Sequence, residues 1–242
     1  MMEELRIHKY LSGQGIMSRR NAEEAVMRGR VSVNGKKAEV GQKVIPEIDE
    51  IAIDGVLLAP KPEGRKTYIM LNKPAGVVTT MADEKERTCI SDILDREDIK
   101  ERIYPVGRLD MYSEGLLLLT NDGEIANKLM HPKNEISKMY HVSIKGELRE
   151  ELVKKFSEPF EIDGKMTSPA KTEVVEQKNG VTKLKIEIAE GKNRQIRRIC
   201  ENLELVILKL KRIRVGNISL GNLKPGQWRH LSQGEINYLK RL

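Results

Sequence analysis

The chain has 242 residues, of which 39% are hydrophobic and 33% charged, with 43 Lys or Arg against 36 Asp or Glu. This composition excludes a disordered chain and predicts a globular protein with room for more than one domain. No apolar run approaches the roughly 20 residues that cross a bilayer, and no signal-peptide core is visible, so we expect a cytoplasmic protein without a membrane partner. Two distant cysteines predict neither a disulfide framework nor a zinc site.

Residues 5–58 predict a small unit of two helices followed by strands. The first helix is expected to end in a glycine pair, and Ser18 has the residue type of an N-cap for the second helix. Val31 and Val33 alternate before Asn34-Gly35, a dipeptide typical of a tight hairpin turn. Acidic residues nearly balance the basic ones here, so charge alone predicts no partner for this unit.

Residues 58–66 are rich in proline, glycine and charge, and predict a linker between a domain at residues 1–62 and a second at residues 63–242. In the second domain, strands outnumber helices and show no regular strand-helix-strand repeat. We therefore expect an α+β protein whose larger domain has a mixed, largely antiparallel sheet flanked by helices.

Alternation in three segments of the larger domain predicts which side chains share a face. Strand side chains point to opposite faces in turn, so every second apolar residue is expected to face the core. The residues grouped in this way are Tyr140, Val142 and Ile144, then Leu184, Ile186 and Ile188, then Leu208 and Leu210.

Asp110 lies directly before the most apolar stretch of the chain, residues 116–119. An aspartate at that place can simply stabilise a turn before a strand. It can also be a catalytic group that a rigid strand end presents, with Arg108 two residues away and therefore on the same side. The residues by themselves leave both interpretations open.

Residues 190–203 form a second group of candidate site residues. Asn193 is expected to cap a helix whose apolar positions fall at helical spacing, which leaves Arg194, Arg197 and Arg198 around the other side of the helix start. Clustered arginines at such a place suit phosphate or carboxylate ligands, although a solvated basic face has the same pattern. From Lys192 to Arg214, eight Lys or Arg stand against two Glu, which favours a polyanionic partner.

The stretch RIHKYLSGQGIMSRRNAEEAVMRGRVSVNGKKAEVGQKV resembles the S4 RNA-binding domain. In that family the helix pair and the following hairpin bind structured RNA. The resemblance therefore implies an RNA partner for the first unit, without implying a reaction.

The segments LNKPAGV, GRLDMYSEGLLLLTNDGE, KMYHV and EGKNRQIRR resemble, in this order, the motifs of the RsuA/RluB-type bacterial ribosomal RNA pseudouridine synthases. The resemblance implies isomerisation of a uridine to pseudouridine in ribosomal RNA, with no cofactor and no metal. It implies Asp110 as the nucleophile, Tyr140 as the ring that stacks on a flipped-out uracil, and Arg197 as the cation that keeps the aspartate ionised.

The same resemblance implies residues that bind the substrate. Arg108 is expected to help fill the gap that the flipped base leaves, and Leu210 to pack against the base. The basic segment is expected to hold the RNA backbone through Lys192, Arg194 and Arg198. The sequence near the C-terminus favours the relatives that act on the large subunit, and a monomer is expected.

Two rival functions are compatible with parts of this pattern. A non-catalytic RNA-binding or ribosome-assembly factor would keep the fold and the basic surface without using Asp110. A metal-dependent RNA hydrolase fits poorly, because none of the four histidines stands in a pair with useful ligand spacing. For the isomerase itself, attack on the ribose and proton abstraction leading to a glycal both remain open as first steps.

Overall fold

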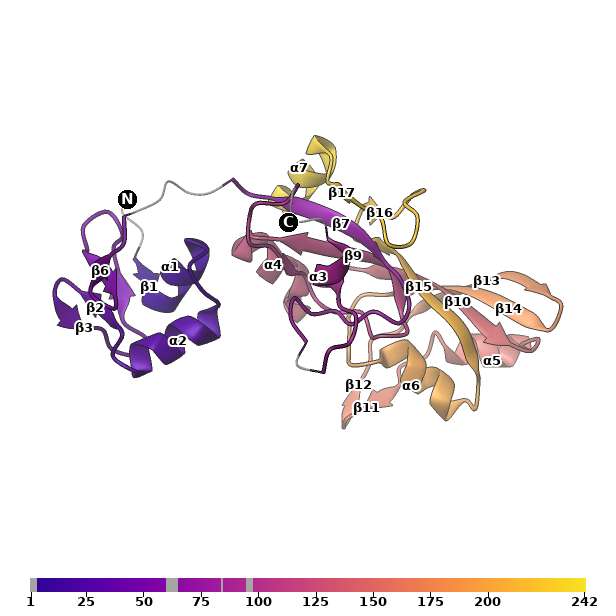
Figure 1. Cartoon of the computed structure of the whole chain (residues 1–242). Helices are drawn as coiled ribbons and strands as arrows, with labels where there is room; N and C mark the ends of the chain where they lie inside the picture. Colours follow the sequence, from indigo (N-terminus) through magenta and orange to yellow (C-terminus); the bar gives the residue numbers. More distant parts are fainter. Residues whose placement is uncertain (1–3, 60–64, 84, 95–97) are drawn as a thin grey trace. The chain divides into compact units, whose positions relative to one another are not determined.

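The computed structural model describes residues 4–59, 65–83, 85–94 and 98–242, which divide into two compact units, Met1–Lys66 and Thr67–Leu242 (Figure 1). The expected domain boundary between residues 62 and 63 lies outside the described residues. In the part of the chain that the structure describes, no helix combines the length and the apolar character needed to cross a bilayer.

The N-terminal unit packs two helices against short antiparallel strands. Its elements are β1 (Leu5–Arg6), α1 (Ile7–Gly13), α2 (Arg19–Met27), β2 (Val31–Val33), β3 (Lys36–Lys37), β4 (Lys43–Val44), β5 (Ile51–Ile53) and β6 (Val56–Leu57). Ser18 caps α2 as predicted, because its hydroxyl accepts a hydrogen bond from the Asn21 backbone N–H at 3.1 Å. The predicted hairpin is also present, with Asn34 and Gly35 both at positive φ between β2 and β3.

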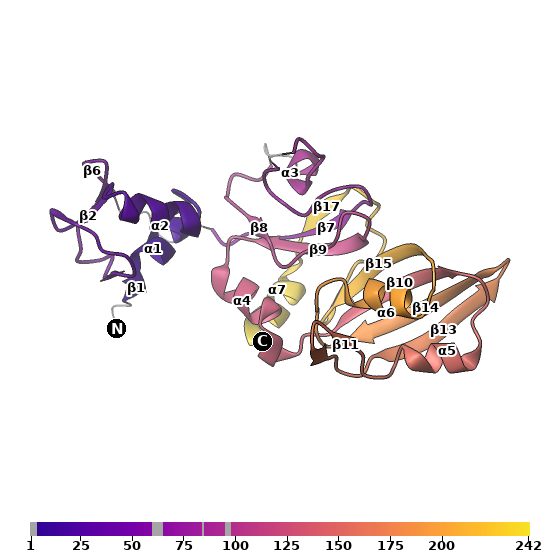
Figure 2. The same cartoon turned by 90° about the horizontal axis from the view of Figure 1, so that it is seen from below.

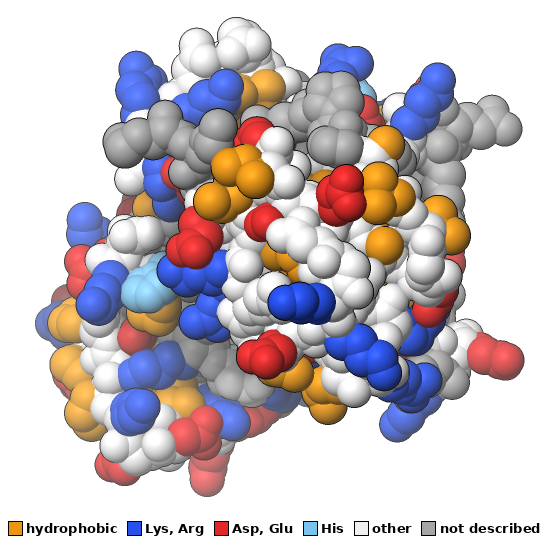
Figure 3. Space-filling view, turned by 90° about the vertical axis from the view of Figure 1, so that its left-hand side faces the viewer, with side chains coloured by type: hydrophobic (Ala, Val, Ile, Leu, Met, Phe, Trp, Pro, Cys, Tyr) orange, Lys and Arg blue, Asp and Glu red, His pale blue; other side chains and the backbone are white. Residues whose placement is uncertain are grey.

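Apolar residues of both helices and of β2 and β5 form the core of this unit; among them are Ile7, Leu11, Ala22, Val26 and Val31. Its surface carries both signs of charge, and Figure 3 shows basic and acidic side chains interspersed on the face toward the viewer. Ion pairs account for part of this mixture, such as Arg30 with Asp54. The near balance of charge in the sequence therefore appears on the surface as well.

The C-terminal unit is built on one large sheet. Its elements are β7 (Tyr68–Lys73), α3 (Ile90–Ile93), β8 (Tyr104–Pro105), β9 (Glu114–Thr120), α4 (Gly123–Met130), the 3-10 turn η1 (Pro132–Asn134), β10 (Lys138–Lys145), α5 (Glu150–Lys155), β11 (Glu161–Ile162), β12 (Lys165–Met166), β13 (Lys171–Lys178), β14 (Val181–Ile188), α6 (Gln195–Asn202), β15 (Ile207–Val215), β16 (Ile218–Ser219), β17 (Trp228–His230) and α7 (Gln233–Arg241).

The strand order of the sheet is β13-β14-β10-β15-β9-β7-β17, with β16 beside β15 and β8 beside β9. Within the described ranges every strand pairing of this sheet is antiparallel except that between β15 and β9. The prediction of a mixed, largely antiparallel sheet in an α+β fold is therefore confirmed.

Helices cover the two faces of the sheet at different places. One core joins residues of α3 and α6 to the inner side chains of β7, β9, β10 and β14, and α6 lies over β10 and β14 in both Figure 1 and Figure 2. A second core on the other face joins α4 and α7 to β7 and β9. Since successive side chains of a strand face opposite ways, the run Leu116–Leu119 is buried along its whole length by the two cores.

The predicted burial of β10 and β14 is confirmed, whereas that of β15 is wrong at one residue. Leu210 is buried, but Leu208 is 54% exposed. The reason is a register shift between Ser143 and Ile144, which leaves Leu208 as an extra residue opposite β10. Such a bulge breaks the two-residue period on which the prediction depended.

Gly115 permits the parallel contact between β9 and β15. Its φ is +105°, and a Cβ at this position would collide with the carbonyl oxygen of Arg212 and lie 2.8 Å from its backbone nitrogen. The two strands pair only at Lys211 with Glu114 and Arg212 with Gly115 before they separate. A glycine is therefore required where the two halves of the sheet meet.

We expect Gly115→Ala to lower the free energy of unfolding by at least about 2 kcal/mol, because strain at positive φ adds to a backbone collision. Gly234→Ala is the matched control, since Gly234 lies in α7 and an added Cβ there meets only Ser232 Oγ at 4.0 Å. Urea unfolding of both variants measures the difference. Equal stability of the two would show that the close approach at Gly115 is unimportant.

Candidate active site

Asp110 lies in the loop that leads into β9, at the edge of a cavity of about 460 Å³. The loop turns directly after it, because the Ser113 backbone N–H donates to the Asp110 carbonyl oxygen at 2.9 Å. The Asp110 side chain is 38% exposed, so the carboxylate is accessible from the cavity. Its backbone thus stabilises a turn while its side chain remains free for chemistry.

Arg197, on the first turns of α6, faces this carboxylate. Its Nε lies 3.6 Å from Asp110 Oδ2, and its Nη2 donates to the Tyr112 carbonyl oxygen at 3.0 Å and to Ser113 Oγ at 3.1 Å. The guanidinium therefore binds the same loop at two further points. Its Nε is buried and has no hydrogen-bond acceptor within the described ranges, so it is free to bond with the carboxylate if the two approach.

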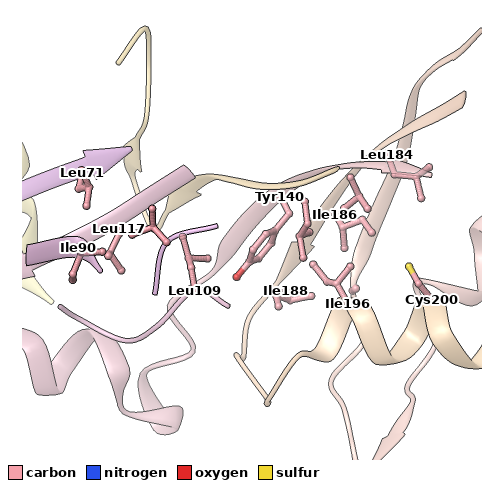
Figure 4. Packing of buried hydrophobic residues seen from close by; sticks show 14 of the residues in the cluster. Leu71, Ile90, Leu109, Leu117, Tyr140, Leu184, Ile186, Ile188, Ile196 and Cys200 are labelled. Atoms are coloured by element: carbon pink, nitrogen blue, oxygen red, sulfur yellow. The ribbon is translucent and has the colours of Figure 1, made fainter. Parts of the chain in front are cut away.

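An aromatic and an aliphatic side chain, Tyr140 and Leu210, also line the cavity. Tyr140 extends from β10, and Figure 4 shows its ring between Leu109 and Ile188. Leu210 lies on the neighbouring strand β15, opposite Val142. Both line the cavity, and both are buried among the residues of the larger core.

The cavity is strongly basic. Six lysines and arginines line it against two carboxylates, Asp110 and Glu190. Seven of the eight predicted site residues contribute to its lining: Asp110, Tyr140, Arg197, Arg108, Leu210, Arg194 and Lys192. Segments separated by more than 80 residues in the sequence thus converge on one site.

Arg198 is not part of this lining. Its Nη1 donates to Asp163 Oδ1 at 2.7 Å, in the turn between β11 and β12. Lys192 and Arg194 do line the cavity, yet each also has an acidic neighbour: Glu190 at 3.7 Å and Glu201 at 2.9 Å.

The predicted cap of α6 is wrong by one residue. Arg194, not Asn193, is the N-cap, and it has a left-handed backbone with φ 52°. A turn precedes the helix, in which the Gln195 N–H donates to the Lys192 carbonyl oxygen at 3.2 Å. The turn sets the start of the helix here in place of an Asn side chain.

Sequence reasoning missed Lys73, which is fully buried at the end of β7. Its Nζ donates to the carbonyl oxygens of Pro74, Met111 and Ser113 at 2.9, 3.2 and 2.9 Å. Burial lowers the pKa of Lys73 to about 8, although the charges of Asp110 and Glu114 act in the opposite direction. Lys73 thus ties β7 to the loop that carries Asp110.

Thr79 holds the other side of the loop. Its hydroxyl donates to the Leu109 carbonyl oxygen at 2.6 Å and accepts from the Leu109 N–H at 3.2 Å. The Lys-Pro pair at the end of an apolar strand was a visible signal for Lys73, since lysines are almost never fully buried. Thr79 had no such signal, because a single threonine in a loop has no distinctive pattern.

A fixed carboxylate, a facing guanidinium and an aromatic ring in a basic cavity define a site for a nucleotide that has been taken out of a nucleic-acid strand. The comparisons with known proteins agree with this class. The sequence model of the family described as RNA pseudouridylate synthase matches residues 67–202, and that of the S4 domain matches residues 5–47. The chain belongs to the RNA pseudouridylate synthase family and carries an N-terminal S4 domain. It is an isomerase that forms pseudouridine in RNA.

Relatives match over nearly the whole chain. An uncharacterized RNA pseudouridine synthase of Aquifex aeolicus is 39% identical over 98% of this chain and 94% of its own length. Ribosomal large subunit pseudouridine synthase B of Bacillus subtilis is 39% identical, over 98% and 96%. The dual-specificity RNA pseudouridine synthase RluF of Escherichia coli is 36% identical, over 98% and 79%.

A solved structure described as a pseudouridylate synthase superposes with a TM-score of 0.69 at 29% identity, covering 97% of this chain and 99% of that one. The fold and the family thus agree with the resemblance found in the sequence motifs.

The buried Lys73 predicts a pH dependence of stability. Its folded pKa of about 8 lies below the ordinary 10.5, so between these values the unfolded chain binds more protons than the folded one. The free energy of unfolding of the wild type should therefore rise with pH relative to Lys73→Met, by about 3 kcal/mol across this range. Urea unfolding at several pH values measures the difference.

Lys183→Met is the control, because Lys183 is an exposed strand residue paired with Glu176. Its stability should follow that of the wild type at every pH. Parallel curves for Lys73→Met and the wild type would contradict the assigned role of burial at Lys73.

Proposed function

We propose that this protein converts a specific uridine of large-subunit ribosomal RNA to pseudouridine, with Asp110 as the catalytic carboxylate. The observation that carries the proposal is the pairing of Asp110 and Arg197 in a basic cavity that Tyr140 also lines. The choice of substrate is supported by the name of the Bacillus subtilis relative, ribosomal large subunit pseudouridine synthase B. The Escherichia coli relative is named for dual specificity, so target choice varies among proteins that share this architecture.

The target base must first leave its stack, at a cost of a few kcal/mol. Tyr140 offers a rigid aromatic face on which the extruded uracil stacks, and Leu210 packs beside it. Because both side chains are held by the core, they need little reordering when the base arrives. Arg108 is exposed at the mouth of the cavity and fills the place that the base leaves.

Asp110 then acts on the ribose. In direct attack, a carboxylate oxygen bonds to C1′ while the bond from C1′ to N1 breaks and the uracil departs with that electron pair. In the glycal route, the carboxylate takes the C2′ proton, a double bond forms between C1′ and C2′, and the same uracil anion departs. Both routes require a carboxylate that is held still, and the contacts of Arg197 with Asp110 and of Lys73 and Thr79 with the loop supply this.

The released uracil turns so that C5 faces C1′ and bonds to it. The carboxylate is displaced, or returns its proton to C2′ in the glycal route, and the hydrogen at C5 leaves as a proton while N1 gains one. Atoms and charge therefore balance in both routes without an external reactant. Stacking on Tyr140 retains the free base in the cavity during this turn.

The basic residues around the cavity are proposed to bind the backbone on either side of the target. Lys192 and Arg194 line the cavity just before α6, and Arg198 lies on α6 outside the lining. In the N-terminal unit, Arg6, Arg19 and Arg20 are exposed, and no ion pair holds them within the described ranges. The S4 domain is therefore proposed to contribute a second RNA contact.

We also propose that the protein acts as a cytoplasmic monomer. One chain supplies the carboxylate, the guanidinium and the aromatic ring of the site. A non-catalytic assembly factor is the alternative function, and it differs from the proposal in needing no carboxylate at position 110.

We expect Asp110→Asn to abolish catalysis while leaving folding intact, because the amide keeps the shape but neither attacks C1′ nor takes a proton. The measurement is tritium release from ribosomal RNA that carries tritium at uracil C5. Asp98→Asn is the matched control, since Asp98 is exposed and should release tritium at the wild-type rate. Wild-type release by Asp110→Asn would refute the assigned nucleophile, and no release by folded wild type would refute the enzymatic function.

Tyr140 is expected to act through its aromatic face. Tyr140→Phe should retain most activity, whereas Tyr140→Leu, which fills the core without an aromatic ring, should lose about ten- to a hundredfold in kcat/KM, as loss of one base stack of ~1–3 kcal/mol predicts. Thermal unfolding checks that both variants fold. A Leu variant as active as the Phe variant would show that stacking on residue 140 is unimportant.

A further inference from the structure

Arg212 is a buried charge without a counter-ion. The residue is only 7% exposed, and its Nε donates to the Leu116 carbonyl oxygen at 2.8 Å. Among the residues that the structure describes, no carboxylate forms an ion pair with it and no acceptor bonds to its two terminal nitrogens. The two terminal nitrogens are therefore free to bind an anionic ligand, and the low exposure of the residue strengthens such a contact.

Its place in the sheet directs Arg212 into the active-site cavity. Tyr140 is its partner across β10 and β15, and paired residues of antiparallel strands point to the same face. The strands β15 and β9 separate just beyond Arg212, and the cavity extends into this fork, where Leu118 and Val215 line it. Arg212 therefore lies beside the aromatic face, on the side toward the fork.

A second cation lies next to it. Lys138 precedes Tyr140 by two residues on β10, so it points to the same face and lines the same cavity. It too has no ion pair within the described part of the chain. Burial lowers the pKa of Lys138, and the charge of Arg212 lowers it further, which places the two cations close together.

The other cations of the cavity differ from this pair. Arg197, Lys192 and Arg194 each have a carboxylate nearby, and Arg108 is exposed to water. Among the described cations of the cavity, Arg212, which is buried, and Lys138, which is half-buried, are thus the two that have no counter-ion and are shielded from water. A neutral base edge cannot offset two adjacent positive charges, whereas a phosphate can, and a phosphate matches the two free nitrogen groups of a guanidinium.

We propose that Arg212 and Lys138 form a phosphate subsite that binds a backbone phosphate of the nucleotide whose base stacks on Tyr140. The inference rests on the proposed function in taking a uridine of RNA as the occupant. The subsite fixes the ribose relative to Asp110, so it is a binding and positioning element for the reaction. The hydrogen bond to Leu116 orients the guanidinium before the RNA arrives.

The test compares uridine 3′,5′-bisphosphate with uridine as ligands of the full-length protein, by NMR titration. The wild type should bind the bisphosphate at least about tenfold more tightly than uridine, as charge-assisted hydrogen bonds to phosphate imply. Arg212→Gln and Lys138→Gln should each bring this ratio toward one, with little change in the affinity for uridine. Equal affinity of the wild type for the bisphosphate and for uridine would contradict the proposed subsite.

Arg214→Gln is the matched control. Arg214 lies on the same strand, but a register shift at Met139 turns it to the other face, where it pairs with Glu187 at 2.8 Å. Its bisphosphate-to-uridine ratio should equal that of the wild type. Should Arg212→Gln fail to fold, Lys138→Gln decides, because Lys138 is only partly buried. If every folded variant still preferred the bisphosphate over uridine as strongly as the wild type does, the proposal would be overturned.

Binding of single-stranded RNA at several salt concentrations gives a readout that a purely structural role would not change. Loss of one phosphate contact should reduce the slope of log affinity against log salt by about 0.7, in Lys138→Gln as in Arg212→Gln. An unchanged slope in both variants would contradict a phosphate contact. Neither measurement needs turnover, so a wild type that binds phosphate here but releases no tritium would refute the proposed function and not the subsite.

Discussion

The loop that carries Asp110 depends on one buried ammonium group. Lys73 at the end of β7 has no contact with solvent, and its three donors reach the carbonyl oxygens of Pro74, Met111 and Ser113. Moving the loop would leave these donors without acceptors in a dry environment, which is costly. Because Lys73 is also the register partner of Gly115, the position of Asp110 follows from the pairing of two core strands. The aspartate is held by the sheet even though it lies in a loop.

A second constraint brings the partner of this aspartate to it. The half of the sheet that carries β7 and β9 meets the half that carries β10 and β15 through two parallel register pairs. Gly115 makes that contact possible, since a side chain there would collide with the backbone of Arg212. The strands then separate, and α6 lies over β10 and β14 so that Arg197 reaches the loop. The cavity is therefore a consequence of a sheet that forks.

The charges of the cavity divide into two kinds. Arg197 already pairs with Asp110 and bonds to the loop at Tyr112 and Ser113, so its main effect is to fix the site. Arg212, which is buried, and Lys138, which is half-buried, have no carboxylate nearby and gain most when a phosphate arrives. An enzyme that must extrude a base from its stack needs both kinds, because the site has to be rigid before binding and attractive to the backbone during binding.

The sequence by itself determined the α+β class, the alternating strands and the Ser18 cap. Its short motifs also predicted that Asp110, Tyr140 and Arg197 share one site, and all three line the same cavity. These features are local, since a period, a cap or a motif is contained within a few neighbouring residues. Only the tertiary structure decided that Leu208 is exposed, that Arg198 pairs outside the cavity, and that Lys73 and Arg212 are buried beside the site. The reason is physical: register, bulges and counter-ions are set by contacts between segments distant in sequence, and those contacts leave no period or spacing along the chain.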